Sequence, residues 1–164
     1  SADDKAEVQA FLRSAHSISA AIGAAEASSG GKAVAAEFDH KDGAAFYEVD
    51  TIANGKQISV EIDAASGKVI KSADEGDVAK AEDDDIVDPA QLGATLTDLV
   101  ARAEQKSGAK VMAISAEHGK GPTPTIEVEV AKPDGSTQEF AMAQDGSLTP
   151  VADGDDGESD EHDG

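Results

Sequence analysis

The sequence lacks several residue types that common functional sites need. It has no cysteine and no tryptophan in 164 residues, and a single tyrosine. The absence of cysteine excludes a disulfide framework and any thiolate site. The motifs of a nucleophile elbow, a P-loop and a dinucleotide-binding loop are also absent. We therefore expect that the protein is not an enzyme.

Positive charge is scarce as well. Thirteen lysines and arginines stand against 34 aspartates and glutamates, which gives a net charge of -21. Such a charge excludes nucleic acid and anionic membrane surfaces as partners. No apolar run is long enough to span a bilayer, so no membrane insertion is expected. Metal cations and cationic proteins are the partners that this composition favours.

The chain begins with Ser1-Ala2-Asp3 instead of a methionine, as a processed export product would. We expect a periplasmic or secreted protein whose signal peptide has been removed.

Two segments hold much of the negative charge, residues 74–88 and 153–164. Acidic runs of this kind are typical of disordered, self-repelling chain. They predict an acidic linker at 74–88 and an acidic disordered tail at 153–164. The tail loosely resembles a calcium loop, but Gly157 stands where a third ligand belongs, and weak ion capture there stays open.

The segments before and after the linker resemble each other at a nearly constant offset. Ser29-Gly30-Gly31-Lys32 aligns with Ser107-Gly108-Ala109-Lys110, and Asn54-Gly55 aligns with Asp134-Gly135. We predict an α+β protein in which a helix and a three-stranded antiparallel sheet occur twice in tandem. The first unit covers residues 1–73, with an extra N-terminal helix, and the second covers 89–152.

Helix signals are clearest in the second unit. Asp88-Pro89 supplies an N-cap and a first-turn proline, apolar residues follow at helical spacing, and Ser107-Gly108 ends the pattern. In the first unit, residues 8–25 form either one bent helix or two helices, with Ser17 or Ser19 as the restart.

Turn pairs set the strand register. Asp42-Gly43 and Asn54-Gly55 are strong signals for two-residue hairpin turns. The resulting core-face rows are Phe38/Tyr47/Ile62, Ala36/Val49/Val60 and Val34/Thr51/Ile58. In the second unit, a three-residue loop at 133–135 pairs Val128 with Phe140 and Ile126 with Met142.

The same register collects carboxylates on the opposite face. Glu37, Glu48 and Glu61 form one row of that face, and Asp39, Asp50 and Asp63 lie in the adjacent rows. In the second unit Glu129 faces Glu139, with Glu127 beside them. Like charges directly opposite each other destabilise a sheet, so a row of three calls for a compensating ligand.

A hard cation would compensate this charge. Calcium takes six to eight oxygen ligands with flexible geometry, and cross-strand glutamates about 4.5–5.5 Å apart at Cβ can clasp one ion. Trivalent lanthanides seek oxygen in the same way. The competing interpretation is a solvated acidic face. A third interpretation, a nickel, copper or zinc site, rests on the dispersed histidines His16, His40, His118 and His162, which lack zinc-site spacing.

Two stretches of the first unit resemble the PepSY domain family. They are Phe46-Tyr47-Glu48-Val49 and residues 60–70, which end in Ala64-Ala65-Ser66-Gly67-Lys68-Val69-Ile70; Gly31-Lys32-Ala33-Val34 fits a further element. The resemblance covers about Ser17 to Lys71, and Pro89 to Val151 follows the pattern less closely. It implies an exported bacterial protein and, from its use in protease propeptides, binding or restraint of a protease. A tandem branch that this chain resembles, lanpepsy, binds lanthanides.

We therefore expect non-enzymatic binding of lanthanide or Ca²⁺ by sheet-face carboxylates, in a monomer. The alternative is a protein-interaction module that restrains a protease or another envelope protein. The predicted metal ligands are Glu37, Asp39, Glu48, Asp50, Glu61, Asp63, Glu127, Glu129 and Glu139.

Overall fold

A computed structural model describes residues 2–80, 86–119 and 121–152. The chain is an α+β protein built on one antiparallel sheet of eight strands, in the order β4-β3-β2-β1-β5-β6-β7-β8. Part of the predicted linker (81–85) and the predicted tail (153–164) lie outside the described residues. The helices are α1 (Ala2–Leu12), α2 (Ile18–Ser29) and α3 (Leu96–Ser107), with short 3₁₀ turns at Val78–Lys80 and Pro89–Leu92. The strands are β1 (Lys32–Lys41), β2 (Ala44–Ala53), β3 (Lys56–Asp63), β4 (Val69–Asp77), β5 (Lys110–Glu117), β6 (Thr125–Ala131), β7 (Thr137–Met142) and β8 (Leu148–Val151).

The prediction of two separate three-stranded sheets was wrong. Each half of the chain contributes four strands, and β1 pairs with β5 to join them into one sheet. β4 and β8 were not predicted from the sequence, because neither strand alternates between buried and exposed residues. All but one residue of β4 is exposed, and its last part, Asp74–Asp77, belongs to the predicted acidic linker. β8 is only four residues long and contains Pro150.

The predicted hairpin register is confirmed in both halves, with one exception. Glu37 pairs with Glu48, Glu48 with Glu61, and Val128 with Phe140. The exception is Val34, which was expected opposite Thr51. A β-bulge shifts the register there, so that Ala33 pairs with Thr51.

The bulge has a local cause in helix α2. The carboxylate of Glu26 (Oε2) accepts a hydrogen bond of 2.8 Å from the backbone N–H of Ala33. Just before β1, the backbone of Gly31 lies against the backbone of Ile52 in β2. A Cβ at Gly31 would lie only 2.5 Å from the carbonyl oxygen of Ile52, so no larger residue fits there. The helix thus supplies the partner that a bulged strand residue loses from the ladder.

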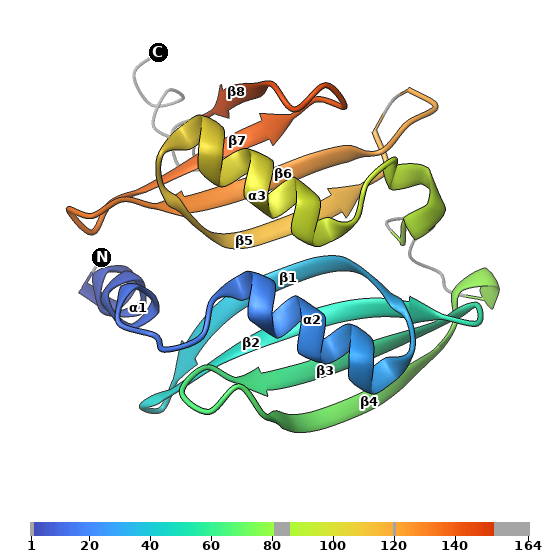
Figure 1. Ribbon diagram of the computed structural model, residues 1–164, viewed down its shortest axis with the longest axis horizontal. Coiled ribbons are helices and arrows are strands. Elements are labelled where there is room, and N and C mark those ends of the chain that lie inside the picture. The colour runs from blue at the N-terminus through green and yellow to red at the C-terminus, as the bar shows by residue number, and fades with distance from the viewer. Residues whose placement is uncertain (1, 81–85, 120, 153–164) are drawn as a thin grey trace, which may run out of the picture.

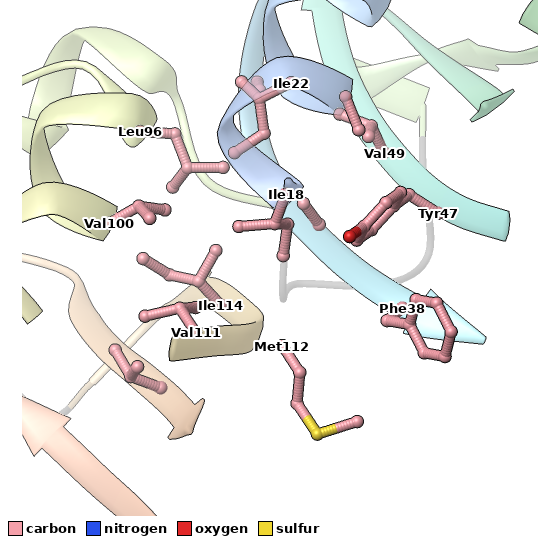
Figure 2. Packing of buried hydrophobic residues seen from close by; sticks show 14 of the residues in the cluster. Ile18, Ile22, Phe38, Tyr47, Val49, Leu96, Val100, Val111, Met112 and Ile114 are labelled. Atoms are coloured by element: carbon pink, nitrogen blue, oxygen red, sulfur yellow. The ribbon is translucent and has the colours of Figure 1, made fainter. Parts of the chain in front are cut away.

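Helices α2 and α3 cover the same face of the sheet, and the opposite face is open (Figure 1). The buried side chains of both halves form one continuous hydrophobic cluster. Ile18 of α2 lies between Leu96 and Val100 of α3 on one side and Tyr47 of β2 on the other (Figure 2). No helix of the described residues is long and apolar enough to cross a membrane.

The helix boundaries refine two predictions. In the first half there are two helices, and Ser17 is the N-cap of the second, accepting a hydrogen bond from the N–H of Ala20. In the second half the predicted helix does not begin at Asp88-Pro89. Those residues start a 3₁₀ turn that ends at Gly93 (φ 74°), and Thr95 caps α3 instead. A left-handed glycine ends helical chain, which is why the helix does not run on from Pro89 although the apolar spacing continues.

The two halves meet around equivalent residues. Glu104 of α3 accepts from the N–H of Val111 at 3.0 Å, as Glu26 of α2 does from Ala33, and each bond joins a glutamate to the N–H seven residues further along the chain. Ala36 of β1 pairs with Ile114 of β5, the residue that the offset between the two similar segments aligns with it. We call this pairing of β1 with β5 the seam of the sheet. Because equivalent residues pair antiparallel there, the sheet is approximately twofold symmetric about the seam.

Candidate functional site

Five glutamates share one row on the open face of the sheet. From β3 to β7 the register reads Glu61, Glu48, Glu37, Ala113, Glu129 and Glu139. Lys71 of β4 ends the row beside Glu61. On β1, β2, β3, β5 and β6 the flanking residues are buried, and on β7 the neighbouring Phe140 packs partly buried against the core. The row therefore lies on the side that the helices leave uncovered. The predicted rows of the two halves are therefore parts of a single row.

A groove of about 370 Å³ lies over the seam of the sheet. Small residues, Ala35, Ala113 and Ser115, are part of its lining where β1 and β5 pair. Six of the nine predicted ligands line it, three from each half: Glu37, Glu48, Asp50, Glu127, Glu129 and Glu139. The pairing of β1 with β5 brings these carboxylates together from segments that lie far apart in the sequence.

The other three predicted ligands lie outside this lining. Asp63 accepts a hydrogen bond of 2.7 Å from the N–H of Ser66 and shapes the turn after β3; hydrogen bonds from Ser66 lower the pKa of its carboxyl group. Asp39 accepts from the N–H of His40 at 2.8 Å. Glu61 belongs to the row but lies beyond the groove.

Partial desolvation and mutual repulsion raise the pKa values of three glutamates in the groove. Desolvation raises the pKa of Glu48 above its usual value, and Asp50, Glu37 and Glu61 raise it further. The pKa of Glu37 is raised by desolvation, then by Asp39, Asp50 and Glu7. In the second half, desolvation and then Glu117 and Glu139 raise the pKa of Glu127. Each shift means that the folded protein holds these negative charges at a cost in free energy.

The carboxylates are spread along the row and do not converge on a point. Within the described residues, no group of three or more histidine, aspartate or glutamate side chains lies close enough to hold a metal ion. Asp50 is instead hydrogen-bonded to Ser59 at 2.7 Å. One lysine contact with a carboxylate lies elsewhere, between Lys56 and Asp74 at 3.7 Å on the exposed edge of the sheet.

The histidines occupy separate structural positions. The ring of His16 packs over Gly67. The backbone carbonyl oxygen of His16 accepts a hydrogen bond of 2.7 Å from the hydroxyl group of Tyr47. Nε2 of His118 lies 2.9 Å from the carbonyl oxygen of Ile86. His40 is half-buried near the end of β1, and His162 lies outside the described residues. Their positions give the nickel, copper or zinc interpretation no support.

Sequence reasoning missed the seam. Ser115 and the two alanines beside it were not singled out, although they separate the acidic walls of the groove. The available signal was the resemblance between the two segments, because a twofold axis brings equivalent residues of two similar surfaces face to face. The short span of pairing, three residue pairs between β1 and β5, leaves no turn or alternation pattern in the sequence to mark it.

The family comparison matches part of the first half. Residues 17–73 match the PepSY family, described as "Peptidase propeptide and YPEB domain", which confirms the resemblance of that segment. No curated protein matches the chain significantly. Among solved structures, the chain is similar to a protein of Clostridium difficile 630 described as a "putative lipoprotein". The two are 13% identical, the similarity covers 80% of this chain and 87% of that chain, and the TM-score is 0.43.

Proposed function

We propose that the open face of the sheet binds hard, oxygen-seeking cations, Ca²⁺ or a trivalent lanthanide, and that the protein is not catalytic. The observation that supports this most is the row of five glutamates on adjacent strands, interrupted only by Ala113. Like charges opposite each other cost stability, and a bound cation would remove that cost.

The chemistry of the groove suits such ions. Its six carboxylates belong to the hard oxygen ligands that calcium prefers in flexible geometry, while magnesium requires a stricter octahedron. Glu48 and Glu139 are half-buried and Glu37 and Glu127 are exposed, so all four carboxylates are accessible to an ion from solvent. Binding would therefore draw together carboxylates that repulsion keeps apart.

The repeat and the family match extend this proposal to the origin and location of the protein. The second half, with the same order of helix and strands, would be a degenerate copy of the PepSY-like first half, which makes the arrangement a tandem one. The match to a family described as a peptidase propeptide domain also favours a place outside the cytoplasm.

Terbium luminescence tests the proposal directly. Tyr47 is the only tyrosine and neighbours Glu48 on β2, with its buried ring on the other side of the sheet. Excitation of Tyr47 during a terbium titration should sensitise emission that saturates, and calcium and lanthanum should compete. The melting temperature should rise in parallel. No sensitised emission and no thermal shift with either ion would overturn the proposal.

A matched variant separates the groove from general surface charge. Asp42 is exposed in the β1–β2 turn at a positive φ of 53°, a conformation that asparagine also adopts readily. Asp42→Asn removes one negative charge in the turn, away from the row, so terbium affinity should stay as in the wild type. An equal loss in Asp42→Asn and Glu48→Gln would identify non-specific attraction.

The second candidate function is a protein-interaction module that restrains a peptidase. The match of residues 17–73 to a peptidase propeptide domain favours it. A pull-down in the presence of chelator should recover a stoichiometric protein partner if this function is correct. Recovery of no partner, with the chain folded, would count against it.

A further inference from the structure

The glutamate row of the open face ends differently on its two sides. At β8 the register sets Val151 opposite Glu139, and at β4 it sets Lys71 opposite Glu61. Within the register that the structure describes, Lys71 is the one basic residue of this row. The sheet therefore supplies a counter-charge of its own at one end of the row and none at the other.

The strand register places Lys71 within reach of Glu61. The pairing of β3 with β4 is regular from Glu61–Lys71 to Ile58–Asp74. Val60, the neighbour of Glu61, is fully buried in the core, so Glu61 and the lysine opposite it lie on the open face. Residues directly opposite each other on antiparallel strands have Cβ atoms about 4.5–5.5 Å apart, and opposite charges at such positions stabilise the pair.

The other two glutamates of the first half have no such partner. Glu37 faces Glu48 and Ala113, and Glu48 faces Glu37 and Glu61. Both line the groove over the seam, whereas Glu61 lies beyond it. The glutamate that has a lysine opposite it is thus the one that the groove leaves out.

We propose that Lys71 is a tethered counter-ion of Glu61 that keeps this carboxylate out of cation binding and so confines the cation site to the groove. This inference rests on the cation binding proposed above and adds the residue that limits the extent of the site. The lysine ammonium group is a compact charge on a flexible stem, so it can take the place beside Glu61 that a metal ion would otherwise occupy.

The effect of this pairing is expected to be small. Lys71 is exposed, so water and salt screen its attraction to Glu61. Exposed ion pairs of this kind shift an equilibrium by about two- to fivefold. A cation that binds Glu61 must first displace the lysine, and its affinity is lowered by this factor.

Terbium titration of the full chain, followed by emission sensitised by Tyr47, tests this role. Lys71→Gln should bind terbium about two- to fivefold more tightly, because Glu61 then becomes available beside Glu48. Lys71→Arg keeps the charge and should bind as the wild type does. Lys106→Gln removes the same charge from an exposed position of α3, on the side of the sheet that the helices cover (Figure 1), and should also bind as the wild type does.

A second substitution identifies the carboxylate that Lys71 masks. Glu61→Gln, added to Lys71→Gln, should remove the gain in affinity. A gain that persists in this double variant would overturn the proposal, since Lys71 would then act on another carboxylate. Equal gains in Lys71→Gln and Lys106→Gln would overturn it too, because they would show general attraction to a more negative chain. A disturbed fold would weaken binding, so a gain also separates this role from a structural one.

Urea unfolding in chelator distinguishes the failure of this inference from the failure of the proposed function. Without a cation, the effects of Lys71→Gln and Glu61→Gln on the free energy of unfolding should be non-additive, because the two charges share one contact. If the wild type binds terbium and Lys71→Gln binds it equally well, the proposed function stands and this inference fails. If the wild type binds no terbium, the proposed function fails, and additive effects in chelator would overturn the pairing of Lys71 with Glu61 as well.

Discussion

The two halves of the chain share a buried framework but differ in the side chains around it. In both, a helical glutamate accepts from the N–H beside a bulge, and a left-handed glycine ends the helix, at Gly30 and Gly108. The difference begins at equivalent positions of β1 and β5. Phe38 of the first half corresponds to Ala116 of the second, and both are buried.

On the open face the two halves carry different charged residues at equivalent positions. The equivalents of Glu37, Glu48 and Glu61 are Ser115, Glu127 and Ala141, so the second half retains only the central glutamate. Glu129 and Glu139 instead correspond to Asp50 and Ser59. The pairing of β1 with β5 sets Glu37 opposite Ala113 and not opposite its equivalent, Ser115. The glutamates of the first half therefore share a row with Glu129 and Glu139. The backbone is thus nearly symmetric while the charge is not, which indicates that the framework and the acidic face can vary independently.

The largest expected effect concerns the aromatic contact found only in the first half. Phe38 packs edge-on against Phe11 of α1 and against Tyr47, with ring centroids 5.3 and 5.4 Å apart. Phe38→Ala should cost about 3–5 kcal/mol in the free energy of unfolding, as for other buried aromatic residues. Urea unfolding measures this cost.

A double-variant cycle sharpens that prediction. If Phe38 holds α1 in place, Phe11→Ala and Phe38→Ala should be non-additive, since the two rings share one contact. Additive costs would show that α1 docks independently of Phe38, and the asymmetry between the halves would then have another cause.

Much of the first half was predictable because its determinants are local. Asp42-Gly43 and Asn54-Gly55 set the hairpin register, and both Asp42 and Asn54 adopt positive φ in the turns. The bulge at Val34 was not predictable, because it depends on the contact of Glu26 with Ala33, which belongs to a different element of the fold. For the same reason the predicted pairing of β1 with β2 was right between the Asp42-Gly43 turn and the bulge, and wrong for Val34 at the bulge.

The candidate site was only partly predictable. The carboxylates could be placed on one face of each half, because local alternation determines the face. The groove depends on the pairing of Ala36 with Ile114, a contact between distant segments. Asp63 was included among the ligands because alternation records which face a residue occupies, whereas its bond to Ser66 depends on the conformation of the turn.

The shared framework gives a second prediction, of equal costs in the two halves. Glu26→Ala and Glu104→Ala each leave the N–H at a bulge without its carboxylate acceptor. Loss of a hydrogen bond to a charged group in a partly buried position costs about 1–3 kcal/mol. The two variants should lose similar stability in urea unfolding, and glutamine at either position should recover part of it. A large cost in one half alone would contradict the equivalence of the two bulges.

Cation binding should instead differ between equivalent positions. Glu48 lies between Glu37 and Glu61, whereas Glu127 lies between Ser115 and Ala141. Glu48→Gln should weaken terbium binding about tenfold, which is about 1.4 kcal/mol, and Glu127→Gln should weaken it less. Titration of Tyr47-sensitised emission compares the variants. Equal losses would mean that the groove, and not the glutamate row of the first half, determines affinity.

The same substitution should act in the opposite direction without a cation. Glu48→Gln removes a charge whose ionisation the fold disfavours, so the chelated variant should be slightly more stable than the wild type. A loss of stability in chelator would show that Glu48 has a structural role. Weakened terbium binding would then reflect a disturbed fold.

The smallest expected effect is the dependence of stability on pH. The folded pKa values of Glu37, Glu48 and Glu127 are raised above 4.5, mainly by desolvation. The folded protein therefore binds more protons than the unfolded chain just above this pH, and this contribution is complete below 4.5 and lost as pH rises through the folded pKa values. Asp63 acts oppositely, because its hydrogen bonds lower its pKa below 3.8 and its contribution is lost in stronger acid.

Stability in chelator should therefore rise as the pH falls from 7 towards 4.5 and decline again below 3.8, as measured by urea unfolding across this range. The rise should be modest, because these carboxylates are partly exposed and solvent screens their repulsion. Glu37→Gln and Glu48→Gln should each flatten it more than Glu127→Gln, since the repulsion is concentrated in the first half. Saturating calcium should flatten it too, because a bound cation and a bound proton relieve the same repulsion. A rise that persists unchanged in all three variants would place the responsible carboxylates outside the row.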